Sequence, residues 1–408
     1  MNILWGIAGI LTILFLSLLL SVDRKHIKGR TVLGALAIQV LFAFITLKLP
    51  AGRAALFWFS EALSGVVGYA NEGISFLFGP LVGDGAVFAF EVLTIIIFFS
   101  SLISILYYYG IMQWVIDILG GALSKLLRTT KVESLSAAAN IFLGQTEAPL
   151  VVKPYLSSVS ESELFAIMVG GFGSVSGTVL VGYSLLGIPL EYLLAASFMS
   201  APSALLLSKI VYPLSTETLN VLEENQDKVK IKENPEEKAV NVIDAAASGA
   251  STGLNMALQI GAILLAFVSL IALLNGILSG IGGWFGIPNL TMEHILGILL
   301  SPVAFLIGVP WNEAVTAAQY IGQKVIVNEF VAYSGVGQIA DTLSDKTLMI
   351  LSFGLAGFAN IGAIASQIGG LGSLAPNRRK DISRLGLRGM VTGALVSLLN
   401  AAIAGMFL

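Results

Sequence analysis

The stretch that decides the fold reads Asn-Ile-Phe-Leu-Gly-Gln-Thr-Glu-Ala-Pro-Leu-Val-Val-Lys-Pro and runs from Asn140 to Pro154. At its centre Gln145, Thr146 and Glu147 place an amide, a hydroxyl and a carboxylate in a row, with apolar residues on both sides. A glycine and a proline bracket this triplet, which disfavours a continuous helix. Inside a bilayer, polar side chains on broken backbone are tolerated only within protein or beside a water-filled cavity. The stretch therefore predicts a binding site.

The composition of the whole chain is that of an integral membrane protein. Of the 408 residues, 56% are hydrophobic and only 12% are charged, and the mean hydropathy is +0.88. Soluble domains carry about 25% charged residues. Cysteine is absent, which excludes disulfides and thiolate metal sites, and the net charge of −3 does not suggest a nucleic-acid partner. The first apolar run lacks a basic flank before it and a cleavage site after it, so we expect a retained membrane helix rather than a signal peptide.

Eight apolar stretches have about the 20 residues that cross a bilayer as a helix. They cover residues 3–22, 31–49, 86–109, 163–186, 189–212, 243–279, 346–372 and 383–408. Two further stretches, 51–80 and 111–130, mix charged and aromatic residues, a pattern typical of helices that lie along the membrane surface. The sequence thus predicts an all-α membrane protein.

Lys and Arg gather in four segments, which the positive-inside rule places in the cytoplasm. These segments are 24–30, 125–131, 228–238 and 378–388. Eight spans agree with this placement only if residues 134–157 and 295–334 enter and leave the membrane by the same side. We therefore expect two re-entrant hairpins, with both termini outside the cell.

The two halves of the chain repeat one order of parts on either side of a hydrophilic segment, 213–241, which we expect to be a flexible cytoplasmic linker. Each half holds a re-entrant stretch, then a span interrupted by polar or small residues, then a plain span. The interruptions fall at 174–178 and 358–362. Interrupted spans in corresponding places indicate the binding site of an inverted-repeat transporter.

Glu147 and Glu329 are the main carboxylates within the apolar segments. A charge at the bilayer centre costs about 2.5–3.5 kcal/mol even on the lenient scale, so each needs a partner or a water-filled cavity. An internal salt bridge is the purely structural alternative. Lys153 and Lys324 are the available bases, although we expect both nearer a membrane face.

Other polar residues are open to a local role. Ser176 and Thr178 can bond their own backbone or a neighbouring helix. Asn312 and Glu313 follow a Pro-Trp turn, where they can cap a helix start or contact a ligand.

The region around the first interruption also contains the elements of a cation site. Asn140 offers a side-chain carbonyl and Ser174 a hydroxyl, and hairpin tips and helix breaks free further carbonyls near Leu143 and Val175. Calcium and magnesium favour carboxylates, so a set of neutral oxygens suits a monovalent ion better. Sodium is the physical expectation.

Enzymatic interpretations have little support. No G-x-S-x-G elbow, H-E-x-x-H helix or P-loop occurs in the sequence. No residue is therefore assigned a catalytic role.

Several motifs in the same order resemble those of the concentrative nucleoside transporters, in the short bacterial form with eight membrane spans. They are GQTEAPL at 144–150, GVPWNEA at 308–314, VNEFVA at 327–332, GFAN at 357–360 and GGLGSL at 369–374. The resemblance covers essentially the whole chain.

The resemblance implies a homotrimer in the bacterial cytoplasmic membrane, in which a scaffold surrounds a mobile, inverted-repeat transport domain in each protomer. The scaffold would comprise 1–133 and 242–290, and the transport domain 134–212 and 291–408. The implied cofactor is Na⁺, the implied ligand is a purine or pyrimidine nucleoside, and the surroundings are membrane lipids.

The resemblance also assigns site residues. Gln145, Thr146 and Glu147 would contact the nucleobase, with Val179 packing nearby. Glu329 and Asn360 would hold the ribose hydroxyls, and Phe358 would line the pocket. The sodium site would consist of Asn140, Leu143, Ser174 and Val175. The sequence departs from the family at Ala363, where many members carry a serine that supports the ribose.

We therefore expect sodium-coupled nucleoside import by an elevator-type movement of the transport domain. A proton-coupled symporter, with Glu147 or Glu329 carrying the proton, is the nearest alternative. A membrane-embedded hydrolase and a channel are alternatives of other classes. The presence of both Asn140 and Ser174 favours sodium over the proton.

Overall fold

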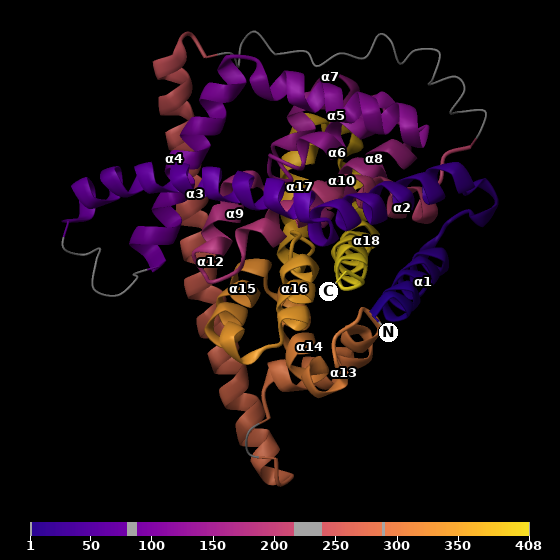
Figure 1. The fold of residues 1–408 in the computed structure, drawn as a ribbon, viewed down its shortest axis with the longest axis vertical. Coiled ribbons are helices and arrows are strands. Elements are labelled where there is room, and N and C mark those ends of the chain that lie inside the picture. The colour runs from indigo at the N-terminus through magenta and orange to yellow at the C-terminus, as the bar shows by residue number, and fades with distance from the viewer. Residues whose placement is uncertain (1, 80–87, 216–238, 288–289, 408) are drawn as a thin grey trace.

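The computed structural model describes residues 2–79, 88–215, 239–287 and 290–407, and every regular element in these residues is a helix (Figure 1). The predicted all-α membrane fold is confirmed. Most of the predicted linker, 213–241, lies outside the described residues.

Within the described residues, seven helices or helix pairs are long and apolar enough to cross a membrane. They are α1 (Asn2–Leu20), α2 (Gly29–Ala43) with its extension to Lys48, α4 (Phe88–Tyr108), α8 (Glu161–Gly173) with α9 (Gly177–Ser184), α10 (Leu190–Val211), α12 (Val242–Trp284) and α18 (Arg379–Ala404). The remaining predicted span, 346–372, consists of two shorter helices, α16 (Asp345–Gly354) and α17 (Ile361–Leu374). Both predicted interruptions are therefore real breaks in the helix.

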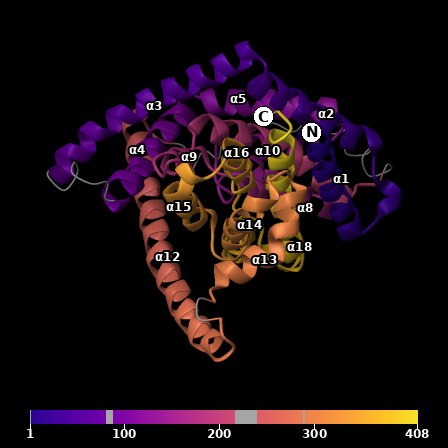
Figure 2. The ribbon, with the colours of Figure 1, turned by 60° about the horizontal axis from the view of Figure 1, so that its bottom comes forward.

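The two stretches predicted at the membrane surface each form a single helix, α3 (Pro50–Phe78) and α5 (Ile111–Leu127). Helix α12 is longer than its predicted span, 243–279. Its 43 residues extend about 65 Å at 1.5 Å per residue, twice the hydrocarbon thickness of a bilayer. It runs along one side of the molecule beside α4 (Figures 1 and 2).

The two re-entrant stretches fold differently. The first comprises α6 (Lys131–Ala139), a turn over 140–147, and a short return through a 3₁₀ turn and α7 (Lys153–Leu156). The second comprises α13 (Met292–Leu306), α14 (Trp311–Ile326) and α15 (Glu329–Ile339), with an angle of 116° between α13 and α14.

Loops that the basic residues place in the cytoplasm meet at one end of the molecule. The amide of Val22 donates to the carbonyl of Val211 at 2.9 Å, and Asn377 donates to the carbonyl of Ser157 at 3.1 Å. The loop after α1 therefore lies beside the end of α10, and the loop after α7 beside the loop after α17. A hydrogen bond from the Tyr212 hydroxyl to Glu161 connects the two pairs.

The two termini lie near each other (Figures 1 and 2). The indole of Trp5 donates to the carbonyl of Phe305 at 2.6 Å, and Lys346 donates to the side chain of Asn2 at 3.0 Å. The start of α1 thus packs beside the end of α13 and the start of α16. The core lies between these two ends, where the spans α8–α9 and α10 are almost completely buried.

Candidate functional site

The tip of the first hairpin leaves a polar atom without a partner. Helix α6 ends at Ala139, and the Asn140 side chain turns back so that its Nδ2 donates to the carbonyl of Ser136 at 2.9 Å. Its Oδ1 is buried and accepts no hydrogen bond in the described structure. A buried carbonyl oxygen left unpaired costs about 1–3 kcal/mol, so this atom calls for a ligand.

The break in the first interrupted span supplies a second such atom. Helix α8 ends at Gly173, and Ser174 adopts an extended conformation. The Ser174 hydroxyl is buried and has no partner among the described residues. Two residues later, the Ser176 side chain accepts from the amide of Thr178 and caps α9, so its local role is confirmed.

The hairpin tip and the break are packed against each other. The amide of Gly177 donates to the carbonyl of Phe142 at 3.0 Å. On the preceding helix, a Cβ at Gly170 would lie 3.0 Å from Nδ2 of Asn140, so a larger residue there would press on the asparagine side chain. The four predicted sodium ligands, Asn140, Leu143, Ser174 and Val175, thus come from two touching segments. Two neutral side-chain oxygens without partners fit a sodium ion.

The polar triplet at the hairpin tip faces several elements. The Glu147 carboxylate accepts from the amide of Gly144 at 3.3 Å. The side-chain carbonyl of Gln145 is buried and lacks a partner among the described residues. Thr146 packs against α17, where a Cβ at Gly370 would lie 2.7 Å from its methyl group. The hydroxyl of Tyr107, on α4, is likewise buried and has no hydrogen-bond partner among the described residues.

A second polar cluster forms where α9, α15 and α17 meet. Glu329 is 4% exposed, and the Tyr183 hydroxyl donates to its Oε1 at 3.0 Å. The Asn360 amide lies 3.5 Å from its Oε2. Glu329 begins α15, and the Oδ1 of Asn360 caps α17 by accepting from the amide of Ala363 at 2.8 Å. Helix N-termini favour negative charge, so both helix starts support a carboxylate here.

The remaining predicted substrate residues surround this cluster. Val179 is buried one helical turn before Tyr183 and shares its helix face. Phe358 lies half-buried in the break between α16 and α17, and its amide donates to the carbonyl of Ser174 at 3.1 Å. That bond joins the two helix breaks directly.

Tyr183 is the site residue that sequence reasoning missed. A tyrosine within an apolar span usually has a hydrogen-bond partner when it is buried, and this was the available signal. Its ring centroid lies 4.6 Å from that of Phe330 and 4.6 Å from that of Tyr333, so its hydroxyl is held toward Glu329.

The structure corrects the placement of Lys324, expected near a membrane face. Its side chain is 2% exposed and donates to the carbonyl of Gly354 at 2.9 Å and to the hydroxyl of Ser397 at 2.6 Å. Within the described part of the chain no side chain caps the start of α14, where Glu313 lies. The Glu313 carboxylate instead accepts from the amide of Ser344 at 3.1 Å and from that residue's hydroxyl at 2.7 Å, and so holds the N-cap residue of α16.

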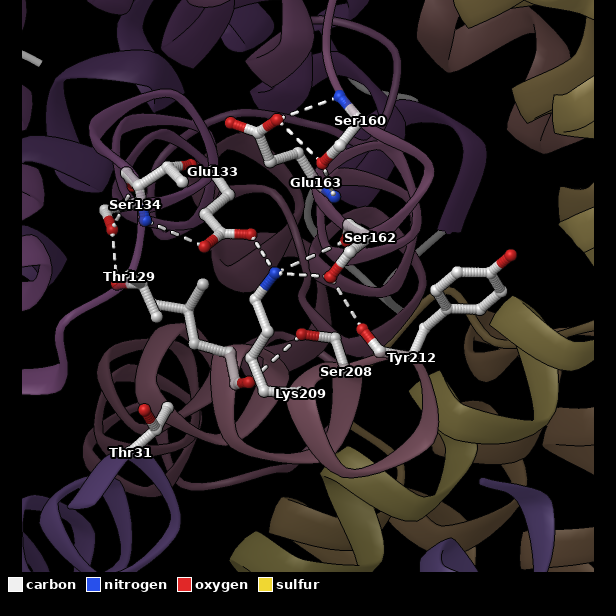
Figure 3. Close-up of polar contacts among 12 residues, drawn as sticks. Thr31, Thr129, Glu133, Ser134, Ser160, Ser162, Glu163, Ser208, Lys209 and Tyr212 are labelled. Atoms are coloured by element: carbon white, nitrogen blue, oxygen red, sulfur yellow. Dashed lines mark hydrogen bonds and ion pairs between the residues drawn. The ribbon is translucent and has the colours of Figure 1, made fainter. Parts of the chain in front are cut away.

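A buried ion pair at the ends of α6 and α10 was not anticipated from the sequence (Figure 3). The Lys209 ammonium lies 2.5 Å from the Glu133 carboxylate and 2.8 Å from the Ser162 hydroxyl. Glu133 also accepts from the amide of Thr130 at 2.9 Å and caps α6. Glu133 lies one residue before the predicted re-entrant stretch 134–157 and Lys209 lies near the end of the predicted span 189–212, so hydropathy alone could not pair them.

Comparison with known families shows matches along nearly the whole chain. A model described as the C-terminus of the Na⁺-dependent nucleoside transporter matches residues 192–405, and that of its N-terminus matches residues 8–81. A model described as a nucleoside-recognition gate matches residues 89–189.

Individual relatives match over their full length. An uncharacterized transporter of Bacillus subtilis, YutK, is 55% identical over 100% of both chains. The nucleoside permease NupC of Helicobacter pylori is 47% identical over 99% of this chain and 98% of its own. Among solved structures, the inward-facing, substrate-bound state of CNTnw is 50% identical over 100% of this chain and 98% of its own, with a TM-score of 0.93. A variant of CNTnw in an intermediate state is 51% identical over 100% of this chain and 99% of its own, with a TM-score of 0.95.

Proposed function

The chain belongs to the Na⁺-dependent, concentrative nucleoside transporter family, and from this premise we propose that it is a sodium-coupled symporter that carries nucleosides inward by an elevator-type movement. It is a multi-pass membrane transporter and not an enzyme. Sodium coupling and the elevator movement are the proposed parts.

One observation carries the sodium assignment. The buried oxygens of Asn140 and Ser174 lack partners among the described residues and lie on two segments that touch. Sodium bound there, with help from the carbonyls of Leu143 and Val175, would satisfy both oxygens at once. The ion would thereby fasten the first hairpin to the α8–α9 break.

The second polar cluster suits the sugar of a nucleoside. A ribose diol can donate two hydrogen bonds to the Glu329 carboxylate, and Asn360 and Tyr183 are placed to hold that carboxylate. At the hairpin tip, Gln145, Thr146 and Glu147 offer a donor and acceptors to a base edge. Val179 and Phe358 would supply apolar contacts. Ala363 removes the hydroxyl that many relatives place beside the ribose.

The two sites share a physical connection. The carbonyl of Ser174, next to the proposed ion, accepts from the amide of Phe358, in the substrate-side break. An ion that orders the break between α8 and α9 would therefore also stabilise the backbone of the break between α16 and α17, where the nucleoside would bind. Such coupling is reciprocal, so nucleoside should also raise the affinity for sodium.

The wider organisation is proposed on the same basis. The scaffold would comprise 1–133 and 242–290 and the transport domain 134–212 and 291–408, assembled as a homotrimer in the bacterial cytoplasmic membrane. The two termini are adjacent, since a Cβ at Gly6 would overlap the side chain of Met406. This adjacency and the gathering of basic loops at the other end support an outward location for both termini. Exposed apolar surface on α12, of which only 6% of the spanning window is buried, supports contact with lipid or a neighbouring subunit.

The test is uptake of radiolabelled uridine and adenosine into proteoliposomes. We expect accumulation to require an inward sodium gradient and to fail when choline replaces sodium. Accumulation driven by a pH jump without sodium would replace this proposal with proton coupling. The nucleoside recovered from inside the vesicles should be intact, which would exclude the alternative of a membrane-embedded hydrolase.

A further inference from the structure

Lys324 is a buried cation that the proposed transport site does not use. It lies in the last turn of α14, five residues before Glu329, and its side chain is 2% exposed. Removing an ammonium group from water costs several kcal/mol unless strong partners compensate it. A lysine at this position therefore requires a reason.

The partners of Lys324 are neutral oxygens rather than a carboxylate. Its Nζ donates to the carbonyl of Gly354 at 2.9 Å and to the Ser397 hydroxyl at 2.6 Å. Ser397 donates its own proton to the carbonyl of Ala394 at 3.0 Å, which leaves its lone pairs for the ammonium. Within the described residues Lys324 has no ion pair, and Glu329 attracts it only at longer range.

Gly354 is the last residue of α16, where the second interrupted span breaks. The final carbonyls of a helix lack intrahelical partners and carry the negative end of the helix dipole. The ammonium is therefore placed where a cation is favoured, and it joins α14, α16 and α18.

The first repeat has a corresponding junction. There the end of α6, at Asn140, meets the end of α8, at Ser174, and leaves two buried oxygens without partners among the described residues. In the second repeat the end of α14 meets the end of α16, and the oxygens at that junction are occupied by Lys324. Both junctions thus present neutral oxygens to a single positive charge.

We propose that Lys324 is a tethered cation that occupies, in the second repeat, the place that sodium takes in the first, and so positions Glu329 without a second ion. This inference rests on the proposed sodium site for its parallel. Lys324 acts through Glu329 and is a positioning residue for nucleoside binding.

The experiment uses the full-length protein in detergent and measures melting temperature and uridine affinity, each with and without methylammonium. Lys324→Ala should weaken uridine binding by about tenfold or more, equivalent to about 1.4 kcal/mol or more. Methylammonium fits the space that the substitution leaves. It should raise the melting temperature of this variant, since a ligand of the folded state stabilises it, and restore most of the affinity.

Two further variants separate charge from packing. Lys324→Gln keeps hydrogen-bond donors and fills part of the space without a charge, so uridine binding should be weak and methylammonium should not restore it. Lys209→Gln is the matched control, because it removes a buried lysine that has its own carboxylate. The Lys209→Gln variant should have a lower melting temperature than wild type and a uridine affinity within about twofold of wild type. Methylammonium should not change that affinity.

Wild-type affinity in Lys324→Gln would overturn the proposal, as would a folded Lys324→Ala that methylammonium neither stabilises nor restores. If Lys324→Ala does not fold, Lys324→Gln decides alone: weak binding at an unchanged melting temperature supports the proposal. Sodium-independent uridine binding by the wild type would refute the ion assignment of the first repeat, while the methylammonium response would still decide the role of Lys324.

Discussion

The junctions of the two repeats have the same architecture, but the oxygens in them differ in whether the chain itself supplies a partner. In the first repeat, the hairpin and the broken span meet around oxygens of Asn140 and Ser174 that lack partners in the described structure. In the second, the ammonium of Lys324 fills the junction from within the chain. A junction that needs an ion from solution can respond to its concentration, whereas one with a covalently attached charge cannot.

The two buried lysines extend this comparison. Lys209 lies 2.5 Å from Glu133 and 2.8 Å from the Ser162 hydroxyl (Figure 3), so its charge is balanced locally. Among the described residues the hydrogen-bond partners of Lys324 are neutral oxygens, and it has no ion pair. Burial alone therefore does not indicate the role of a lysine, and the identity of its partners does.

The largest expected effect comes from the carboxylate of the second repeat. Glu329→Gln replaces an acceptor of two ribose hydrogen bonds with an amide, and bonds to a charged group contribute about 1.5–3 kcal/mol each. We expect kcat/KM for uridine uptake to fall by about 100-fold or more. The melting temperature should keep its dependence on sodium, because the proposed ion site lies in the other repeat. If Glu329→Gln lost both uridine uptake and the sodium dependence of its melting temperature, this separation of the repeats would be contradicted.

The next effect concerns the ion junction. Asn140→Ala removes one of the two oxygens without partners, so the sodium concentration for half-maximal uridine uptake should rise by about tenfold, equivalent to about 1.4 kcal/mol. The maximal rate at saturating sodium should change less. Ser134→Ala is the matched control, because it lies on the same helix and its buried hydroxyl already bonds Thr129 and the carbonyl of Thr130. An unchanged sodium requirement in Asn140→Ala would place the ion elsewhere.

A smaller effect is expected at Tyr183, which connects the first repeat to the carboxylate of the second. Tyr183→Phe retains the ring packing against Phe330 and Tyr333 and removes only the hydroxyl. We expect KM for uridine to rise about fivefold, corresponding to a loss of about 1 kcal/mol. The increase should be smaller for 2′,3′-dideoxyuridine, which lacks the diol. Equal increases for both substrates would show that the hydroxyl acts on packing and not on the ribose site.

The smallest effect concerns the departure from the family. Ala363 is buried in the first turn of α17, where its amide donates to the side chain of the N-cap residue Asn360. Ala363→Ser restores a hydroxyl near the proposed ribose position, and a neutral hydrogen bond contributes about 0.5–1.5 kcal/mol. We expect KM for uridine to fall about threefold. Competition uptake with the common nucleosides checks this value, and an unchanged KM and selectivity would show that the position does not contact substrate.

Hydropathy, charge and Gly/Pro placement determined much of the molecule without a structure. The apolar stretches correspond to α1, α2, α4, α8–α9, α10, α12 and α18, and the interruptions at 174–178 and 358–362 are helix breaks. These features depend on interactions within one segment, or between a segment and the bilayer. A sequence reports such interactions directly.

The tertiary structure alone decided which polar groups meet. Tyr183 and Glu329 are 146 positions apart, and Lys324 and Ser397 are 73 apart, so no local pattern could pair them. Lys324 was expected near a membrane face, yet it is buried, as is Lys209 near the end of α10. Whether a charge near the end of an apolar segment reaches water or a partner depends on the helices that pack around it. That packing is a property of the whole fold.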